Sequence, residues 1–360
     1  MNDHSAPVLK WDIGTAYELF ISLQVLHNPD EFGLRPSWAA GVRSRLSPEQ
    51  RKIIEEAQEV IKIPFHWIYS LPQPKDTASV LWALRQIPPE GRLPVLGIGP
   101  GKADEAAELL RNVAARRSWD QKDFNFLREY HRSHNHESPR PKTLTTVLDK
   151  WSHAAEFGEQ FREALQSYYQ SFFADEEERI ATALRMGLER AQELAKRASL
   201  AELLETLSQW LQMQEYLEEN EILLIPSFWC SPLAYIDKIS AECRVITFGV
   251  RPSDASLDPG EAVPDTLLLT LKALADPTRL RILCYLVQEP LTPAQLARRL
   301  RLRPPTLTHH LRALRLAGLV HVGIGSKEER FYTARLEAIF SLQAYLKEFL
   351  ACDRHGENGE

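Results

Sequence analysis

The sequence predicts a mainly α-helical protein in two parts, and three observations support this fold class. The first 220 residues contain several capped amphipathic helices. Two short segments rich in β-branched and apolar residues follow, between residues 221 and 250. From residue 266 a regular series of helices and one hairpin takes up the rest of the chain. We therefore expect an α-helical N-terminal domain with a short β segment, followed by a smaller domain of helices and two strands.

The composition limits the number of domains and the compartment. At 360 residues the chain is longer than one ordinary hydrophobic core, so two or three domains are expected. The N-terminus has no basic and apolar leader, and no apolar run is long enough to cross a membrane. The four cysteines are scattered, which fits a reducing compartment. We expect a cytoplasmic protein with no membrane partner.

Three segments of the N-terminal part begin with a helix-capping pattern. Residues 47–61, 175–197 and 199–220 each start with Ser or Asp and carry Glu or Gln three positions later. In this pattern the first side chain accepts a hydrogen bond from a backbone N–H, and the second reaches back to the first residue. The pattern predicts helices that begin directly after Ser47, Asp175 and Ser199.

Aromatic side chains follow a helical spacing between residues 157 and 173. The favoured interpretation is a stripe that packs in the core. The alternative is a pocket for an apolar ligand. The residues assigned to that pocket are Phe161, Tyr168, Tyr169 and Phe172.

The stretch from residue 251 to 265 carries three prolines and no periodic pattern, which is typical of a linker. It follows the two predicted strands. The resulting division is a helical sensor or assembly domain at 1–220, a β segment and linker at 221–265, a C-terminal domain at 266–352, and a disordered tail at 353–360.

Charge separates the two parts. Residues 266–360 contain 14 Lys and Arg and 9 Asp and Glu, a balance of +5, so the other 265 residues carry −11. The segment from Leu291 to Val320 contains six arginines and neither Asp nor Glu. A small basic module on a larger acidic part indicates a nucleic-acid-binding end.

The elements of the C-terminal part follow in order. Helices are predicted at about 266–275, 277–288, 293–300, 304–316 and 336–350, and a hairpin around Gly-Ser-Lys precedes the last of them. Asp276 and Thr292 are the expected N-caps of the second and third helices. The turn between the third and fourth helices has about three residues, which predicts a helix-turn-helix followed by a β-wing.

The segments "LKALADPTRLRILCYL", "TPAQLARRL" and "PPTLTHHLRALRLAGLV", with the hairpin, resemble the winged helix-turn-helix of the ArsR/SmtB family of bacterial transcription regulators. The long N-terminal part resembles the extension of large ArsR-like regulators. The resemblance implies a regulator that binds a palindromic operator in double-stranded DNA as a homodimer. It also implies that a small-molecule or protein effector acts at the N-terminal domain.

The resemblance places the fourth helix in the major groove of DNA. It implies that Thr306, Thr308, His309 and Arg312 face the bases, that Pro305 contacts a thymine methyl group, that Arg298, Arg299, Arg315 and Lys327 contact phosphates, and that Arg330 reaches the minor groove. Arg303 is included in this DNA-binding set because it precedes the helix.

Two arginines depart from the family pattern, which has Gly at the tight turn and Ser at the cap. Arg301 and Arg303 take those places. An Arg in a left-handed turn costs on the order of 1 kcal/mol, and a missing cap oxygen costs about as much. Pro304 compensates in part, because it needs no N–H partner and holds Arg303 extended.

The resemblance also implies a dimer in which the first and last helices of the module pack across a two-fold axis. The matching residues are Leu267, Leu268, Leu271, Leu336, Ile339, Phe340, Tyr345, Leu346 and Phe349. The alternative is that they pack on the N-terminal domain of the same chain, whose acidic charge would then screen the module from DNA.

Metal, cofactor and catalytic sites are not expected. The family metal ligands are absent, because residues 292–300 contain no Cys and the last helix contains neither Asp nor His. His131, His134 and His136 lie with two glutamates in a polar stretch, where surface residues are favoured over zinc ligands. Residues 96–103 lack the first Gly and the hydroxyl of a phosphate loop. The alternatives to a regulator are an interaction scaffold localised by its DNA-binding tail, or an enzyme with a regulatory tail.

Overall fold

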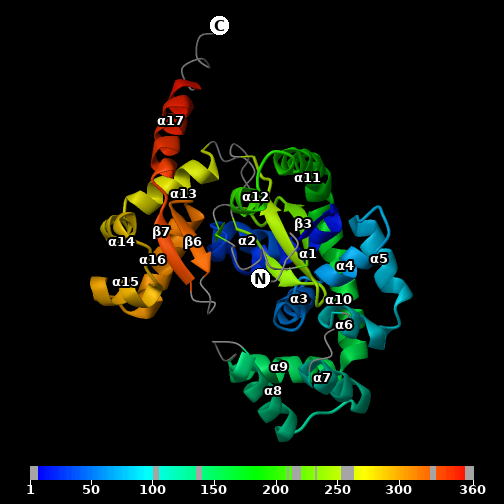
Figure 1. The fold of residues 1–360 in the computed structure, drawn as a ribbon. Helices are drawn as coiled ribbons and strands as arrows, with labels where there is room; N and C mark the ends of the chain where they lie inside the picture. Colours follow the sequence, from blue (N-terminus) through cyan, green and yellow to red (C-terminus); the bar gives the residue numbers. More distant parts are fainter. Residues whose placement is uncertain are drawn as a thin grey trace, which may run out of the picture.

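The computed structural model describes residues 7–99, 105–134, 140–208, 211–212, 220–231, 233–252, 263–324 and 330–352. Its chain is mainly α-helical, with one small sheet in each part, so the predicted fold class is confirmed. Figure 1 shows the C-terminal winged part, coloured yellow to red, beside the N-terminal part. Within the described residues, no helix combines the length and the apolar character that a membrane span requires.

The N-terminal part consists of β1 (Val8–Trp11), α1 (Thr15–His27), η1 (Pro29–Glu31), α2 (Pro36–Arg43), α3 (Pro48–Val60), α4 (Phe65–Ser70), α5 (Thr77–Gln86), α6 (Pro89–Gly97), α7 (Glu105–Arg116), α8 (Gln121–His134), α9 (Pro141–Ser152), α10 (Ala154–Tyr168), η2 (Tyr169–Phe173), α11 (Ala174–Ala195), α12 (Leu200–Leu207), β2 (Leu211–Gln212), β3 (Glu221–Ser227), β4 (Ile236–Lys238) and β5 (Cys243–Gly249). The C-terminal part consists of α13 (Asp265–Leu274), α14 (Pro277–Gln288), α15 (Pro293–Leu300), α16 (Pro304–Leu316), β6 (Val320–Ile324), β7 (Arg330–Ala334) and α17 (Glu337–Cys352).

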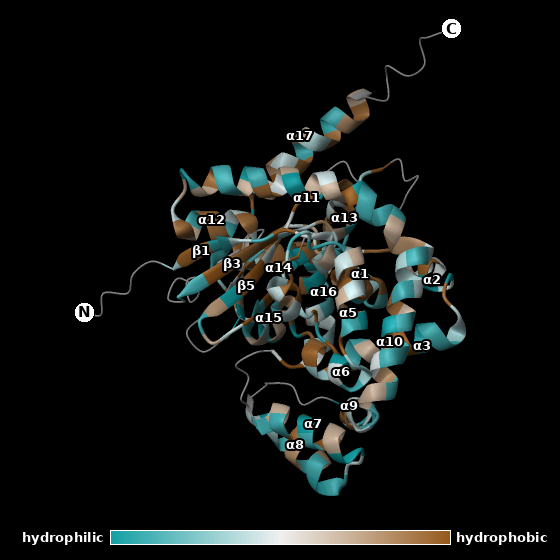
Figure 2. Cartoon of the chain, turned by 90° about the vertical axis from the view of Figure 1, so that its right-hand side faces the viewer, coloured by the Kyte–Doolittle hydropathy of each residue, from teal (hydrophilic) through white to brown (hydrophobic). Residues whose placement is uncertain are grey.

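A four-stranded sheet lies at the centre of the N-terminal part, in the order β1-β3-β5-β4. β1 and β5 both run parallel to β3, whereas β4 is antiparallel to β5. Residues 222–227 of β3 are all buried, as expected for a parallel strand covered on both faces. Figure 2 shows β3 and β5 as hydrophobic strands inside the molecule. Because β1 pairs with β3, the β segment predicted at 221–250 belongs to the same sheet as the first residues of the chain, where no strand was predicted.

Two of the three capping patterns in the N-terminal part form as predicted. Ser47 with Gln50 and Ser199 with Glu202 make complete capping boxes. The third prediction is wrong, because Asp175 lies inside a continuous helix: α10 passes through the π-helical turn η2 into α11 without a break. The helix predicted from 199 to about 220 is also too long, because α12 ends at Leu207.

Glu18 of α1 connects this helix to the end of β3. It is fully buried, and its Oε2 accepts hydrogen bonds from the backbone N–H groups of Phe228 at 3.0 Å and Trp229 at 2.8 Å. Burial raises the pKa of Glu18 to about 7, because the charged form is poorly solvated there. The N-terminal core therefore contains a carboxyl group whose protonation is linked to folding.

The two parts share a hydrophobic cluster. It contains Leu204 of α12 and Phe248 of β5 together with Leu283 of α14 and Leu296 of α15. The short strand β2 also pairs in parallel with β6, with Leu211 opposite Val322. The C-terminal part therefore packs on the N-terminal part through side chains and through one stretch of backbone.

Candidate DNA-binding site

Helices α15 and α16 form the predicted helix-turn-helix. Thr292 and Gln295 make a complete capping box at the start of α15. The apolar side chains of the two helices, Leu296, Leu300, Leu307, Leu311 and Leu314, are buried. Because these residues hold one face of α16 against the domain, the opposite face is directed outward.

The turn between the helices has the strained geometry that the sequence predicted. Arg301 has φ 56° and ψ 41°, which is the left-handed region that normally favours Gly. Arg303 is extended at φ −72° and ψ 144°, and its side chain makes no capping hydrogen bond. The backbone N–H of Leu302 donates to the carbonyl of Ala297 at 3.0 Å, which closes the end of α15. Arg301 therefore adopts the left-handed conformation in place of the family Gly, and Arg303 stands at the N-cap without the capping oxygen of the family Ser.

The exposed face of α16 carries the residues assigned to base contact. Pro305, Thr306, Thr308, His309 and Arg312 are all exposed. The hydroxyl of Thr308 donates to the carbonyl of Pro304 at 3.0 Å, so its remaining capacity is as an acceptor. The structure brings these five side chains together on one helix, and their contacts with bases stay a prediction.

The other residues of the DNA-binding set, which were assigned to phosphates, to the minor groove or to no particular contact, differ in exposure. Arg298, Arg303 and Arg330 are exposed, whereas Lys327 lies outside the described residues. Arg330 begins β7 and pairs with Ile324, at the end of the hairpin next to its turn. The exposure of these three arginines leaves them available to a partner, and their contacts with DNA stay a prediction.

Two further arginines of the DNA-binding set are less available: Arg299 makes an ion pair within the chain, and Arg315 is half-buried. The Nη1 of Arg299 lies 2.7 Å from Oε1 of Glu289, and its guanidinium lies 5.9 Å from the ring centroid of Tyr285. Arg315 is half-buried, and burial lowers the pKa of its guanidinium from the ordinary value. A phosphate would have to compete with Glu289 for Arg299, a contact that the sequence analysis did not anticipate.

Arg312 makes an ion pair with the N-terminal part. Its Nη2 lies 3.4 Å from Oε1 of Glu31 in η1, and the two side chains are 43% and 52% exposed. No local pattern in the sequence could have indicated this contact, because the two residues are 281 positions apart.

The wing is a tight hairpin on β6 and β7. A Cβ placed on Gly323 would lie 1.9 Å from Cζ of Phe331, so only Gly fits where this ring crosses the strand. The other edge of β6 pairs with β2, which makes the wing sheet three-stranded. The wing is therefore held to the N-terminal part through Val322 and Gly323 of β6.

The terminal helices of the domain expose an apolar surface. The exposed members of the predicted dimer interface are Leu271 at 39%, Leu336 at 46%, Ile339 at 39% and Phe340 at 71%. Leu346 and Phe349 are half-buried. Leu267 is only 1% exposed, because its side chain already packs within the single chain. The prediction that Leu267 belongs to the dimer interface is therefore wrong. The four residues that stay exposed form the kind of apolar surface that marks an interaction site.

The aromatic residues between 157 and 173 pack as a core. Phe161, Tyr168 and Phe172 are at most 6% exposed, and Tyr169 is half-buried in the π-helical turn. The hydroxyl of Tyr168 lies 2.8 Å from Oγ of Ser22. The cavity that Phe161 lines has a volume of about 10 Å³, too small for a ligand. The arrangement matches the favoured interpretation of a core stripe.

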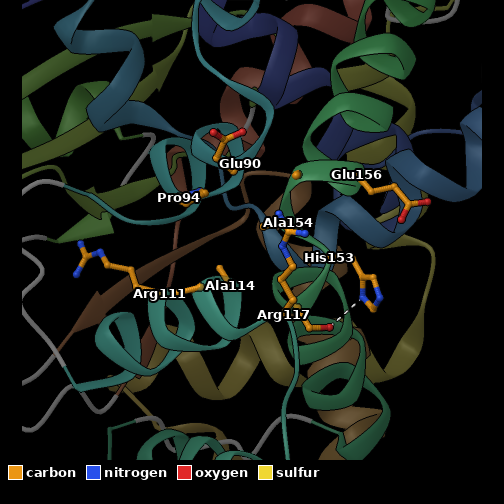
Figure 3. Close-up of a pocket in the computed structure, with 11 residues that line it drawn as sticks. Glu90, Pro94, Arg111, Ala114, Arg117, His153, Ala154 and Glu156 are labelled. Atoms are coloured by element: carbon orange, nitrogen blue, oxygen red, sulfur yellow. Dashed lines mark hydrogen bonds between the residues drawn. The ribbon is translucent and has the colours of Figure 1, made fainter.

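A larger cavity lies elsewhere in the N-terminal part. It has a volume of about 760 Å³ and is lined by Glu90, Pro94, Arg111, Ala114, Ala115, Arg117, Ser152, His153, Ala154, Ala155 and Glu156. Figure 3 shows Glu90 and Pro94 on α6 above Arg111 and Ala114 on α7. The sequence analysis missed this cavity, because its lining comes from four helices, α6, α7, α9 and α10, and carries no motif.

Metal ligands do not gather in the part of the chain that the structure describes, where no three His, Cys, Asp or Glu side chains could hold one ion. His136 lies outside the described residues, and so does the side chain of His134. The polar stretch that contains them is therefore not tested.

Comparisons with known proteins concern the C-terminal part of the chain. The sequence model of the arsR family of bacterial regulatory proteins matches residues 276–322. The reduced form of HlyU from Vibrio cholerae is 34% identical over 22% of this chain and 83% of its own, with a TM-score of 0.19. NolR from Sinorhizobium fredii is 29% identical over 26% of this chain and 94% of its own, with a TM-score of 0.21. None of the curated proteins matches the chain. The helix-turn-helix of the C-terminal domain therefore matches the arsR family of bacterial regulatory proteins.

Proposed function

We propose that the chain regulates transcription in the cytoplasm by binding a palindromic operator as a homodimer through α16. The observation that carries this proposal is the exposed face of α16, which combines hydroxyl, imidazole and guanidinium groups with no acidic residue on the helix itself. Arginine and threonine on a helix of this size are suited to read base edges in the major groove.

Selection of bound sequences from a random DNA pool tests the proposal. We expect a site with two-fold symmetry. Arg312→Ala should then weaken binding to that site by about 1–3 kcal/mol and weaken binding to random DNA much less. Equal losses on both DNAs would show that Arg312 contacts phosphate only, and failure to select any sequence would remove operator binding.

The homodimer is supported by the exposed apolar residues of α13 and α17. Burial of one such side chain stabilises an interface by roughly 1.5–3 kcal/mol. The double variant Ile339→Glu with Phe340→Glu should therefore be a folded monomer by light scattering and should lose operator binding. A wild type that is monomeric at micromolar concentration would contradict the proposed dimer, as would a double variant that stays dimeric.

The cavity between α6, α7 and α10 is the proposed effector site. Its volume is within the range of small-molecule sites, and both Arg111 and Arg117 line it. These features suit a small molecule with a carboxylate or phosphate group. Titration with such compounds should raise the Tm of the wild type more than that of an Arg111→Ala and Arg117→Ala variant. Equal shifts in both proteins would assign the effector to another site.

A further inference from the structure

The base-reading helix contacts an acidic segment of the same chain. Glu31 in η1 lies 3.4 Å from the guanidinium of Arg312, one of the residues of α16 that are assigned to base contact. Asp30, the residue before Glu31, is also exposed. Arg312 therefore faces carboxylate charge in the place where it would face DNA.

The contact lies at the edge of a larger interface between the two parts. A Cβ on Gly33, two residues after Glu31, would lie 3.0 Å from Cδ1 of Leu269 in α13, so the Leu269 side chain packs against the chain next to η1. The parallel pairing of β2 with β6 and the shared hydrophobic cluster fix the same two parts against each other. The ion pair is thus held in place by packing and does not depend on its own small energy.

We propose that this arrangement is an autoinhibited state, in which Glu31 occupies the position of DNA on Arg312. The proposal rests on the proposed function, because it requires that Arg312 contacts DNA. A carboxylate oxygen accepts the same guanidinium hydrogen bonds as O6 and N7 of guanine. One guanidinium cannot make both sets of contacts with the same N–H groups. The carboxylates of Asp30 and Glu31 also repel the phosphates of an approaching duplex. DNA binding and the Glu31 contact therefore exclude each other, and any effector that moves η1 away from α16 would release the helix.

The variants Glu31→Gln and Glu31→Arg test the proposal by operator affinity at low salt. Exposed ion pairs are weak, so Glu31→Gln should tighten binding about two- to five-fold. Glu31→Arg should tighten it on the order of ten-fold, because repulsion replaces attraction. Both gains should shrink as salt is raised, since the two side chains are exposed. Melting curves check that the variants fold.

Asp30→Arg is the matched control, because it makes the same change in net charge one residue away. It should tighten binding by clearly less than Glu31→Arg. Equal effects of the two variants would show that only overall charge matters, and the specific pair would be wrong.

A double-mutant cycle separates this inference from the proposed function. In an Arg312→Ala background, Glu31→Gln should tighten operator binding clearly less than in the wild type, because only the repulsion between Glu31 and the phosphates is then removed. If it tightens binding there as much as in the wild type, the pair with Arg312 contributes nothing and the autoinhibitory pair is wrong. If the wild type and every Glu31 variant bind no operator, the proposed function has failed and the inference falls with it. If the wild type binds and the Glu31 variants bind equally well, only the inference has failed.

Discussion

Two helices of this protein carry conspicuous side chains at helical spacing, and the fold uses them in opposite ways. The helix formed by α10 and η2 buries Phe161, Tyr168 and Phe172, while α16 exposes Thr306, His309 and Arg312. The difference follows from what surrounds each helix. α10 packs on both α3 and α6, whereas α16 has only one face against its own domain. A periodic pattern therefore locates a helix, and the number of its faces that neighbouring elements cover determines which side chains stay available to a partner.

The largest expected effect concerns the buried helix. Phe161→Ala should lower the free energy of unfolding by about 3–5 kcal/mol, because it removes a large side chain from a packed core. Thr306→Ala on the exposed face should change it by less than about 0.5 kcal/mol. Urea unfolding of both variants measures the contrast, and a small effect of Phe161→Ala would revive the interpretation of that region as an open pocket.

The second expected effect is a change of stability with pH, to which a residue of each part contributes with opposite sign. Glu18 has a folded pKa of about 7, raised above its ordinary value of 4.5, so the folded state retains a proton that the unfolded state loses. Its contribution to stability is complete below about pH 4.5 and is lost as the pH rises through 7, a change on the order of 3 kcal/mol. Glu18→Gln should remove this decline in urea unfolding measured from pH 5 to 8.

The pKa of Asp276 in the C-terminal domain is shifted in the opposite direction, below its ordinary value. A hydrogen bond from the backbone N–H of Arg279 is the main cause of its lowered pKa, so its contribution to stability is lost as the pH falls. If the free energy of unfolding of Glu18→Gln declines above pH 5 as steeply as that of the wild type, the carboxyl group of Glu18 does not cause the pH dependence.

The smallest expected effect concerns the turn before α16. Arg301→Gly should raise the free energy of unfolding by up to about 1 kcal/mol, because Gly adopts the left-handed conformation without strain. The same change removes one positive charge and should weaken DNA binding. Arg298→Ala removes a charge nearby without altering a strained residue, so it should weaken binding with no gain in stability. Equal stability of Arg301→Gly and the wild type would mean that the strain is relieved elsewhere.

The C-terminal domain could be predicted from the sequence because its signals are local. Asp276 and Thr292 cap their helices through residues three positions away, and Arg301 adopts the left-handed conformation within a three-residue turn. The N-terminal part was less predictable. β1 has four residues and becomes a strand only because β3, more than two hundred positions later, lies beside it. Asp175 carries a good capping pattern, but the π-helical turn continues the helix through it.

The candidate DNA-binding site also combines features with local sequence signals and features that depend on distant residues. The residues exposed on α16 follow from the helical pattern and the family resemblance. The partners of Arg299 and Arg312 do not: Glu289 lies just outside the acid-free segment, and Glu31 lies in the other part of the chain. Ion pairs between distant segments depend on how the parts pack, and that packing is set by the shared cluster of apolar side chains rather than by the charges.

The strand β2 has a consequence for the solution behaviour of the wing. Without it, β6 would be an outer strand with unpaired backbone groups at Val322 and Gly323, and such strands readily recruit strands from other molecules. Leu211 and Gln212 cover that edge within the same chain. The N-terminal part thus protects the wing against unwanted self-association, a role that is independent of any signal it detects.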